Sequence, residues 1–339
     1  MHMSRVQFCV CIVTVAALVA GALFVSASAQ ELSRDLHARA RAFPEVGPGL
    51  VAVKRDAAGR YFILAAPAKS IAFYSAEGKL AGQIPGANSG SAPIVFAEDF
   101  DIDSSGRVLV ADRGANAVKI FAADGMLAAT VTVPAPTSIE ALSGGEFAVT
   151  TLRSARLIDI YGARGNFLRS IGERPNPKQL AEANRSANLT RLSGDPSGYI
   201  YLALAPAADM VIRKYDRFGY AAAEISVPAS DTAQETQTPR KDGVTFERRG
   251  EAPPPKPAIR ALGIDPATQE IWAAIGNRLL HFDKDGVSGT VYRTFTPEGA
   301  RLEPNTILVE PDRLLIGADP LGVFEFARPD KLAPAASTR

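Results

Sequence analysis

Residues 101–125 of this 339-residue chain read DIDSSGRVLVADRGANAVKIFAADG. Two short apolar runs, VLVA and VKIF, are separated by clusters of Asp, Gly, Asn and Ser, which favour turns. Each run has the length of one short strand, and the glycines suit turn positions that need a positive φ. The stretch therefore predicts antiparallel strands joined by tight turns.

The same pattern recurs along the chain. In five places an aromatic residue is followed four positions later by Gly, and these glycines lie 47, 40, 54 and 67 residues apart. A repeat of about 40–45 residues with four short strands is typical of β-propeller blades. The six copies span residues 50–85, 101–134, 138–172, 189–228, 259–294 and 305–330.

Several predicted strands are apolar on consecutive residues, as in YFILAA and IYLALA. This composition is expected of sheets that neighbouring sheets cover on both faces. We therefore predict an all-β protein, a six-bladed β-propeller of four-stranded antiparallel blades. A β-sandwich with many hairpins is the alternative.

The second copy resembles an NHL repeat. The resemblance is good in this copy, partial in the first, fourth and fifth, and weak in the third and sixth. It implies a six-bladed propeller fold far more than it implies a function. The matching residues are Asp103, Gly106, Asp112, Gly114, Asn116, Phe121 and Gly125.

The first 29 residues predict a signal peptide. Arg5 precedes an uncharged apolar run at residues 8–25, and Ala-Ser-Ala at residues 27–29 offers the small side chains that a signal peptidase needs. We expect cleavage before Gln30 and export to the periplasm or the extracellular space. An uncleaved N-terminal membrane anchor is the alternative, because about 18 apolar residues just suffice to span a bilayer.

The rest of the chain divides around the propeller at residues 47–330. Residues 30–46 are an N-terminal segment, of which residues 38–46 are expected to close the ring as the outer strand of the sixth blade. A short helix over residues 31–41 is the alternative. Residues 229–258 are polar and Pro-rich and predict a mobile inter-blade loop, and residues 331–339 predict a C-terminal tail.

Charge and cysteine content limit the partners. Cys9 and Cys11 lie in the signal, so the exported chain has no cysteine, and a core of this size needs no disulfide. Loss of Arg5 leaves 36 basic and 36 acidic residues. This balance argues against a nucleic-acid partner, which requires a basic stripe. We expect a monomer that contacts no membrane beyond the export signal.

Three long connections, residues 86–96, 173–188 and 229–258, join one predicted blade to the next. In a propeller they share one face with the turns between second and third strands. Loops carry binding sites more often than the scaffold does. This face is therefore predicted to bind a protein, peptide or glycan, although loops without a function are the alternative.

Polar residues at this end of the inner two strands are candidate ligand contacts. Carboxylates and guanidiniums that converge on a channel of low dielectric can clamp a polar ligand. A water-filled channel with mutually paired charges explains the same residues. The candidates are Glu98, Asp99, Asp112, Arg113, Glu140, Arg153, Arg191, Arg260, Asn305 and Asp319.

Calcium is the candidate cofactor, since Glu98, Asp99, Glu140 and Asn305 offer the oxygens that Ca²⁺ prefers. Six-bladed propellers similar to this chain include calcium-dependent lactonases and lyases. The leading prediction is a binding or scaffold module without catalytic residues, and a calcium-dependent hydrolase or lyase acting at the channel mouth is the alternative.

Zinc chemistry is disfavoured, because only two histidines and no cysteine remain after processing. One of them, His281, is interpreted as a packed or edge residue. The remaining Asx side chains in the repeats are interpreted as turn formers, since they bond to their own backbone. They are Asp103, Asn116, Asp195 and Asp265.

Overall fold

The computed structural model describes residues 33–66, 69–85, 94–173, 190–204, 210–227 and 259–331, which belong to one compact unit. The predicted signal peptide, most of the three long connections and nearly all of the tail lie outside these ranges. Helix in the described ranges is confined to two single turns, η1 (Arg113–Ala115) and η2 (Ser143–Gly145). Accordingly, none of these ranges contains a helix long and apolar enough to cross a membrane.

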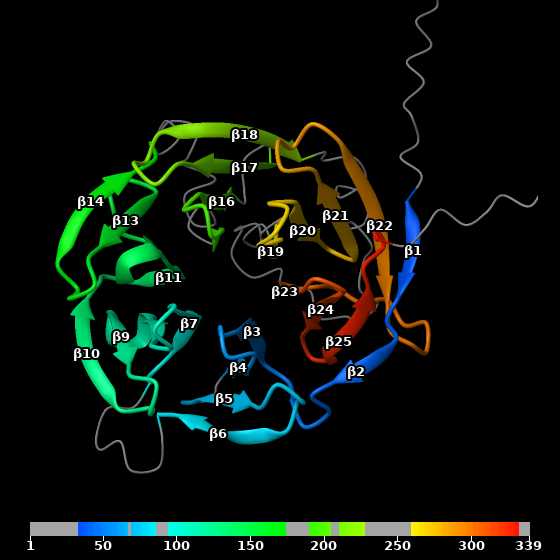
Figure 1. Ribbon diagram of the computed structural model, residues 1–339, viewed down its shortest axis with the longest axis horizontal. Coiled ribbons are helices and arrows are strands. Elements are labelled where there is room, and N and C mark those ends of the chain that lie inside the picture. The colour runs from blue at the N-terminus through cyan, green and yellow to red at the C-terminus, as the bar shows by residue number, and fades with distance from the viewer. Residues whose placement is uncertain are drawn as a thin grey trace, which may run out of the picture. The chain divides into compact units, whose positions relative to one another are not determined.

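Six sheets surround a central axis, and the first strand of each sequence repeat lies innermost in its sheet (Figure 1). Blades 1 to 3 follow one another in the first half of the chain. Their strands are β3 (Leu50–Arg55), β4 (Tyr61–Ala65), β5 (Ile71–Tyr74) and β6 (Leu80–Ile84); β7 (Ala97–Ile102), β8 (Val108–Asp112), β9 (Ala117–Phe121) and β10 (Leu127–Thr132); and β11 (Pro136–Ala141), β12 (Phe147–Thr151), β13 (Ile158–Tyr161) and β14 (Phe167–Ile171).

Blades 4 to 6 complete the ring, and the last has only three strands from the C-terminal half. Their strands are β15 (Arg191–Gly194), β16 (Ile200–Leu204), β17 (Met210–Tyr215) and β18 (Ala221–Val227); β19 (Ala261–Ile264), β20 (Ile271–Ile275), β21 (Arg278–Phe282) and β22 (Gly289–Phe295); and β23 (Thr306–Val309), β24 (Arg313–Ala318) and β25 (Gly322–Ala327). The predicted six-bladed propeller is confirmed, and the β-sandwich alternative is wrong.

The N-terminal segment closes the ring, as predicted. β2 (Ala40–Ala42) pairs antiparallel with β25 and is the outer strand of blade 6. An additional strand, β1 (Arg34–His37), pairs parallel with β22 as a fifth strand of blade 5, which the sequence did not predict. Because β1 and β2 are consecutive, the segment joins blades 5 and 6.

The repeated turn glycines are explained by contacts between blades. Gly165 and Gly219 have φ of 81° and 94°, a region that favours glycine. A Cβ on Gly165 would lie 2.3 Å from Val131 of the preceding blade, and one on Gly219 would lie 2.2 Å from Ile171. Glycine at these positions therefore permits both the turn and the close contact with the outer strand of the preceding blade.

The Asx residues interpreted as turn formers have that role. Asp103 Oδ1 accepts the backbone N–H of Ser105 at 2.9 Å, and Asp195 and Asp265 accept equivalent bonds in their own turns. Asn116 has a left-handed φ of 51° and so does shape its turn, but its side chain does not bond to its own backbone as predicted, because its Oδ1 accepts the backbone N–H of Ala135 at 3.1 Å. These side chains belong to the scaffold.

Candidate functional site

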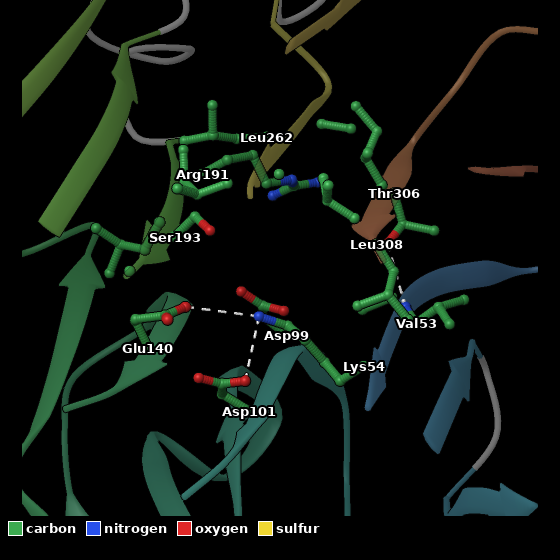
Figure 2. Close-up of a pocket in the computed structure, with 18 of the residues that line it drawn as sticks. Val53, Lys54, Asp99, Asp101, Glu140, Arg191, Ser193, Leu262, Thr306 and Leu308 are labelled. Atoms are coloured by element: carbon green, nitrogen blue, oxygen red, sulfur yellow. Dashed lines mark hydrogen bonds and ion pairs between the residues drawn. The ribbon is translucent and has the colours of Figure 1, made fainter. Parts of the chain in front are cut away.

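The inner strands of all six blades line a central cavity of about 250 Å³ (Figure 2). The channel mouth is the end at which the inner strands begin, beside the turns between second and third strands. Half of the residues predicted as ligand contacts line this cavity and half do not. Those that line it are Glu98, Asp99, Glu140, Arg191 and Asn305.

Several polar side chains of the cavity bond to the next blade. Asp99 Oδ2 accepts the hydroxyl of Ser138 at 2.5 Å and the backbone N–H of Ile139 at 3.2 Å. Asp101 Oδ2 accepts the backbone N–H of Ala141 at 2.7 Å. The inward edge of an inner strand has no neighbouring strand, so these side chains satisfy N–H groups that would otherwise lack a partner. They also hold blades 2 and 3 together.

A buried ion-pair cluster, here called the channel cluster, connects blades 1, 2 and 3. Lys54 Nζ lies 3.2 Å from Asp101 Oδ1 and 3.5 Å from Glu140 Oε2. Figure 2 shows the ammonium between the two carboxylates. Sequence reasoning found Glu140 but missed Lys54 and Asp101.

A shared strand position could have revealed the channel cluster. Lys54, Asp101 and Glu140 are each the last residue but one of their inner strand. The same position holds Ser193, Gly263 and Leu308 in the other three inner strands. Charge at this level of the channel is therefore confined to blades 1 to 3.

The channel cluster has strongly perturbed protonation. Burial raises the pKa of Glu140 to about 8, and the nearby Asp101 carboxylate adds to this effect. Burial also raises the pKa of Asp99. Burial alone would lower the pKa of Lys54, but the carboxylates of Asp101 and Glu140 outweigh it and raise that pKa. These shifts favour the charged form of Lys54 and the protonated form of Glu140.

A second group of candidates forms the blade 2 rim, which we define as Val95, Phe96, Glu98 and Arg113. Arg113 Nε lies 2.8 Å from Glu98 Oε1, and its guanidinium carbon lies 5.1 Å from the centroid of the Phe96 ring. Asp112 is fully buried below the rim and accepts the backbone N–H groups of Val95 and Phe96, both at 2.9 Å. Asp112 thus positions the rim from below.

The remaining candidates are scattered. Arg191 Nε donates to the carbonyl of Arg260 at 3.1 Å, and Arg260 pairs with Glu303 at 3.0 Å. Asp319 accepts the backbone N–H of Gly49, outside the cavity lining. Arg153 is exposed and lies outside that lining as well.

The proposed calcium ligands do not form one cage. Glu98 pairs with Arg113, and Asp99 accepts bonds from the neighbouring blade. The Asn305 amide donates to the carbonyl of Leu50, although its Oδ1 has no hydrogen bond. The Lys54 ammonium lies beside Glu140, where a metal ion would bind. Calcium binding stays a prediction, and this arrangement argues against it.

Comparison with known proteins shows the fold class. No family model matches the chain, and no curated protein matches its sequence. A streptogramin B lyase structure is similar, with a TM-score of 0.54, 13% identity and coverage of 83% of this chain and 84% of that chain. Virginiamycin B lyase from Staphylococcus aureus is also similar, with a TM-score of 0.52 and 14% identity. That match covers 83% of this chain and 85% of that chain.

A third similar structure is the extracellular domain of the proposed one component system BT4673 from B. thetaiotaomicron. Its TM-score is 0.50 at 11% identity, and the match covers 84% of this chain and 33% of that chain. At these identities the likenesses show the fold alone. They define the chain as a six-bladed β-propeller, with which the resemblance to NHL-type propellers is consistent.

Proposed function

We propose that this chain is an exported, monomeric binding module that takes a peptide segment of a partner protein at the blade 2 rim. The observation that carries the proposal is an exposed apolar pair next to an ion pair at the edge of the central cavity. Val95 and Phe96 are 54% and 40% exposed, although both are apolar. Contiguous exposed apolar surface with a polar rim marks interaction sites.

The rim is organised before any ligand binds. Two hydrogen bonds from Asp112 fix the backbone of Val95 and Phe96, and Asp112 itself pairs with Lys119 at 2.8 Å. A Cβ on Gly114 would lie 2.7 Å from the Val95 side chain, so the single turn η1, which contains Gly114, packs closely against the rim. A rigid rim lowers the entropic cost of binding.

The chemistry of the rim favours a peptide over a glycan. The Arg113 guanidinium lies over the Phe96 ring and leaves less of it free to stack on a sugar. Glu98 and Arg113 form an ion pair with each other. When a peptide binds, each can instead pair with a group of opposite charge on the peptide. Their neighbouring apolar side chains suit a peptide with both apolar and charged residues.

Peptide display on the exported chain tests this proposal. Peptides selected by the wild type should lose roughly tenfold or more in affinity with Phe96→Ala, as expected for an aromatic hot spot. Phe218→Ala is the matched control, because Phe218 is also exposed and also lies under an arginine, with Arg217 4.7 Å from its ring centroid. Selected peptides that bind wild type and Phe96→Ala with equal affinity, or a display experiment that selects no peptide, would reject the rim as a peptide site.

A second candidate function is a hydrolase or lyase at the channel mouth. The raised pKa of Glu140, about 8, would allow this carboxyl group to exchange a proton near neutral pH, and two proteins of similar fold are lyases. The test is turnover of a streptogramin B antibiotic. Turnover by the wild type that Glu140→Gln abolishes would favour the enzyme over the binding module.

A further inference from the structure

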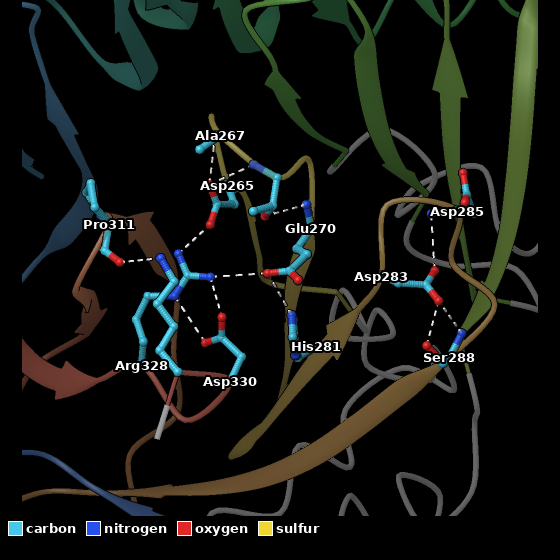
Figure 3. Close-up of polar contacts among 12 residues, drawn as sticks. Asp265, Ala267, Glu270, His281, Asp283, Asp285, Ser288, Pro311, Arg328 and Asp330 are labelled. Carbon is cyan, nitrogen blue, oxygen red and sulfur yellow. Dashed lines mark hydrogen bonds and ion pairs between the residues drawn. The ribbon is translucent and has the colours of Figure 1, made fainter. Parts of the chain in front are cut away.

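A second charged cluster lies between blades 5 and 6 (Figure 3), and none of its charged residues lines the central cavity. The Arg328 side chain is fully buried there and contacts the carboxylate of Asp265, that of Glu270 at 3.2 Å and that of Asp330 at 2.5 Å. Together with His281 these residues are here called the blade 5–6 cluster. Asp265 and Glu270 flank the turn between β19 and β20, whereas Asp330 follows β25.

His281 contributes a nitrogen without a hydrogen bond. Its Nε2 is buried, has no hydrogen-bond partner among the described residues and lies 3.4 Å from Glu270 Oε2. The imidazole stacks on Trp272, with centroids 4.0 Å apart and planes inclined by 13°. This packing fixes the ring with Nε2 directed toward Glu270, as Figure 3 shows.

The charges of this cluster do not balance. Three carboxylates share one guanidinium, so among the described residues of the cluster negative charge is in excess. Asp265 is buried, Glu270 is half-buried and Asp330 is exposed, so the excess charge is only partly screened by water and its burial is costly. A divalent cation supplies the missing charge, and each carboxylate that binds Arg328 keeps lone pairs for a second partner.

We propose that His281, Glu270 and Asp330 bind one divalent transition-metal ion of the zinc type. One donor atom from each of the three residues lies within 4.8 Å of the other two. An imidazole nitrogen with two carboxylate oxygens suits Zn²⁺, Co²⁺ or Ni²⁺, whereas Ca²⁺ prefers six to eight oxygens.

The site would reinforce the ring where the N-terminal segment also joins two blades. Its ligands come from blade 5 and from the end of blade 6. An ion that binds only the folded chain raises its stability. This site is independent of the proposed peptide site at the blade 2 rim.

Trp272 is the single tryptophan of the chain and stacks on His281, so it reports on the site. Titration of the full chain with Co²⁺ or Ni²⁺ should quench its fluorescence saturably at one ion per chain, and Zn²⁺ should compete. His281→Gln should remove the saturable phase. His37→Gln is the matched control, because His37 is the other described histidine and also stacks on a ring, that of Phe295 at 5.0 Å.

Glu270→Gln provides a second variant that leaves the stacked pair of rings in place. It should weaken Co²⁺ binding by roughly tenfold or more, because it removes one ligand. It should also lower the rise in melting temperature that Zn²⁺ produces in the wild type. Absence of saturable quenching in the wild type, or equal quenching in the wild type and His281→Gln, would overturn the proposal.

Discussion

The channel cluster and the blade 5–6 cluster both place carboxylates beside a cation, but the channel carboxylates are buried, whereas in the blade 5–6 cluster only Asp265 is buried and Asp330 is exposed. The two clusters also differ in how their charge is balanced. In the channel, burial raises the pKa of Glu140 to about 8, and the Lys54 ammonium lies 3.2 Å from Asp101 Oδ1. Around Arg328, three carboxylates share one guanidinium, and the His281 Nε2 has no hydrogen bond. The pKa shift in the first cluster favours a proton on Glu140, and the second cluster is proposed to recruit a metal ion.

The charged residues of the channel hold the blades together, whereas the proposed binding sites lie elsewhere. A charged group in the channel of a propeller is a natural candidate for ligand binding. Here Asp99 and Asp101 accept backbone N–H groups of the next blade. The Lys54 ammonium pairs with the carboxylate of Asp101 inside the channel. The proposed contacts with outside partners therefore lie at the blade 2 rim and at the blade 5–6 cluster.

Loss of Arg328 should have the largest effect on stability. Arg328→Met would leave three carboxylates together, and breaking a buried ion pair in this way costs about 3–5 kcal/mol. Urea denaturation of the variant at neutral pH measures the cost. Arg293→Met, which removes a half-exposed ion pair with Asp35, should cost less than about 1 kcal/mol. Equal costs would show that the blade 5–6 cluster is not a buried network.

Loss of Lys54 should have a smaller effect, because the raised pKa of Glu140 favours its protonated form. Lys54→Met leaves Asp101 as the main uncompensated charge and should cost about 2–3 kcal/mol at pH 7. The cost should fall at pH 5, where carboxyl groups take up protons. The exposed Lys79→Met is the control, and a cost for Lys54→Met that does not change with pH would argue against the channel ion pair.

The pH dependence of Glu140→Gln isolates the proton in the channel. The pKa of Glu140 is about 8 in the folded chain and near 4.5 when unfolded, so its stabilising contribution is present below pH 4.5 and is lost as the pH rises through 8. Glutamine does not titrate. The variant should therefore match the wild type near pH 5 and exceed it by about 2 kcal/mol or more at pH 9. A difference that shrinks with rising pH would refute the raised pKa.

Deletion of residues 30–37 should have the smallest effect among changes to the ring, because it removes β1 and leaves β2 to close blade 6. The melting temperature should fall by a few degrees, as expected for the loss of about 1 kcal/mol. Deletion of residues 30–46, which removes β2 as well, should lower it much further. Equal losses would show that β2 adds nothing to closure.

The fold could be predicted from the sequence because its signals are local. Turn residues such as Asp103 and glycines such as Gly165 are recognisable within a few positions, and they recur in most copies. Ring closure followed from the missing fourth strand of blade 6. β1 could not be predicted, because four residues without alternation carry no signal for a parallel pairing with β22.

The sites could be predicted only in part, because they depend on contacts between distant copies. Glu140 was found from its polarity, but its partner Lys54 was missed since it lies two blades away in the sequence. Asp112 was grouped with ligand contacts, whereas the structure uses its carboxylate to hold the rim from below. His281 was interpreted as a packed residue, and its stack on Trp272 agrees with that interpretation.

Metal stoichiometry tests the difference between the two clusters most directly. Equilibrium dialysis against Zn²⁺ should give one bound ion per chain for the wild type and for Glu140→Gln, and none for His281→Gln. This pattern follows if the channel balances its charge with Lys54 and a proton while the blade 5–6 cluster takes a metal ion. A bound ion that survives in His281→Gln and is lost in Glu140→Gln would contradict it.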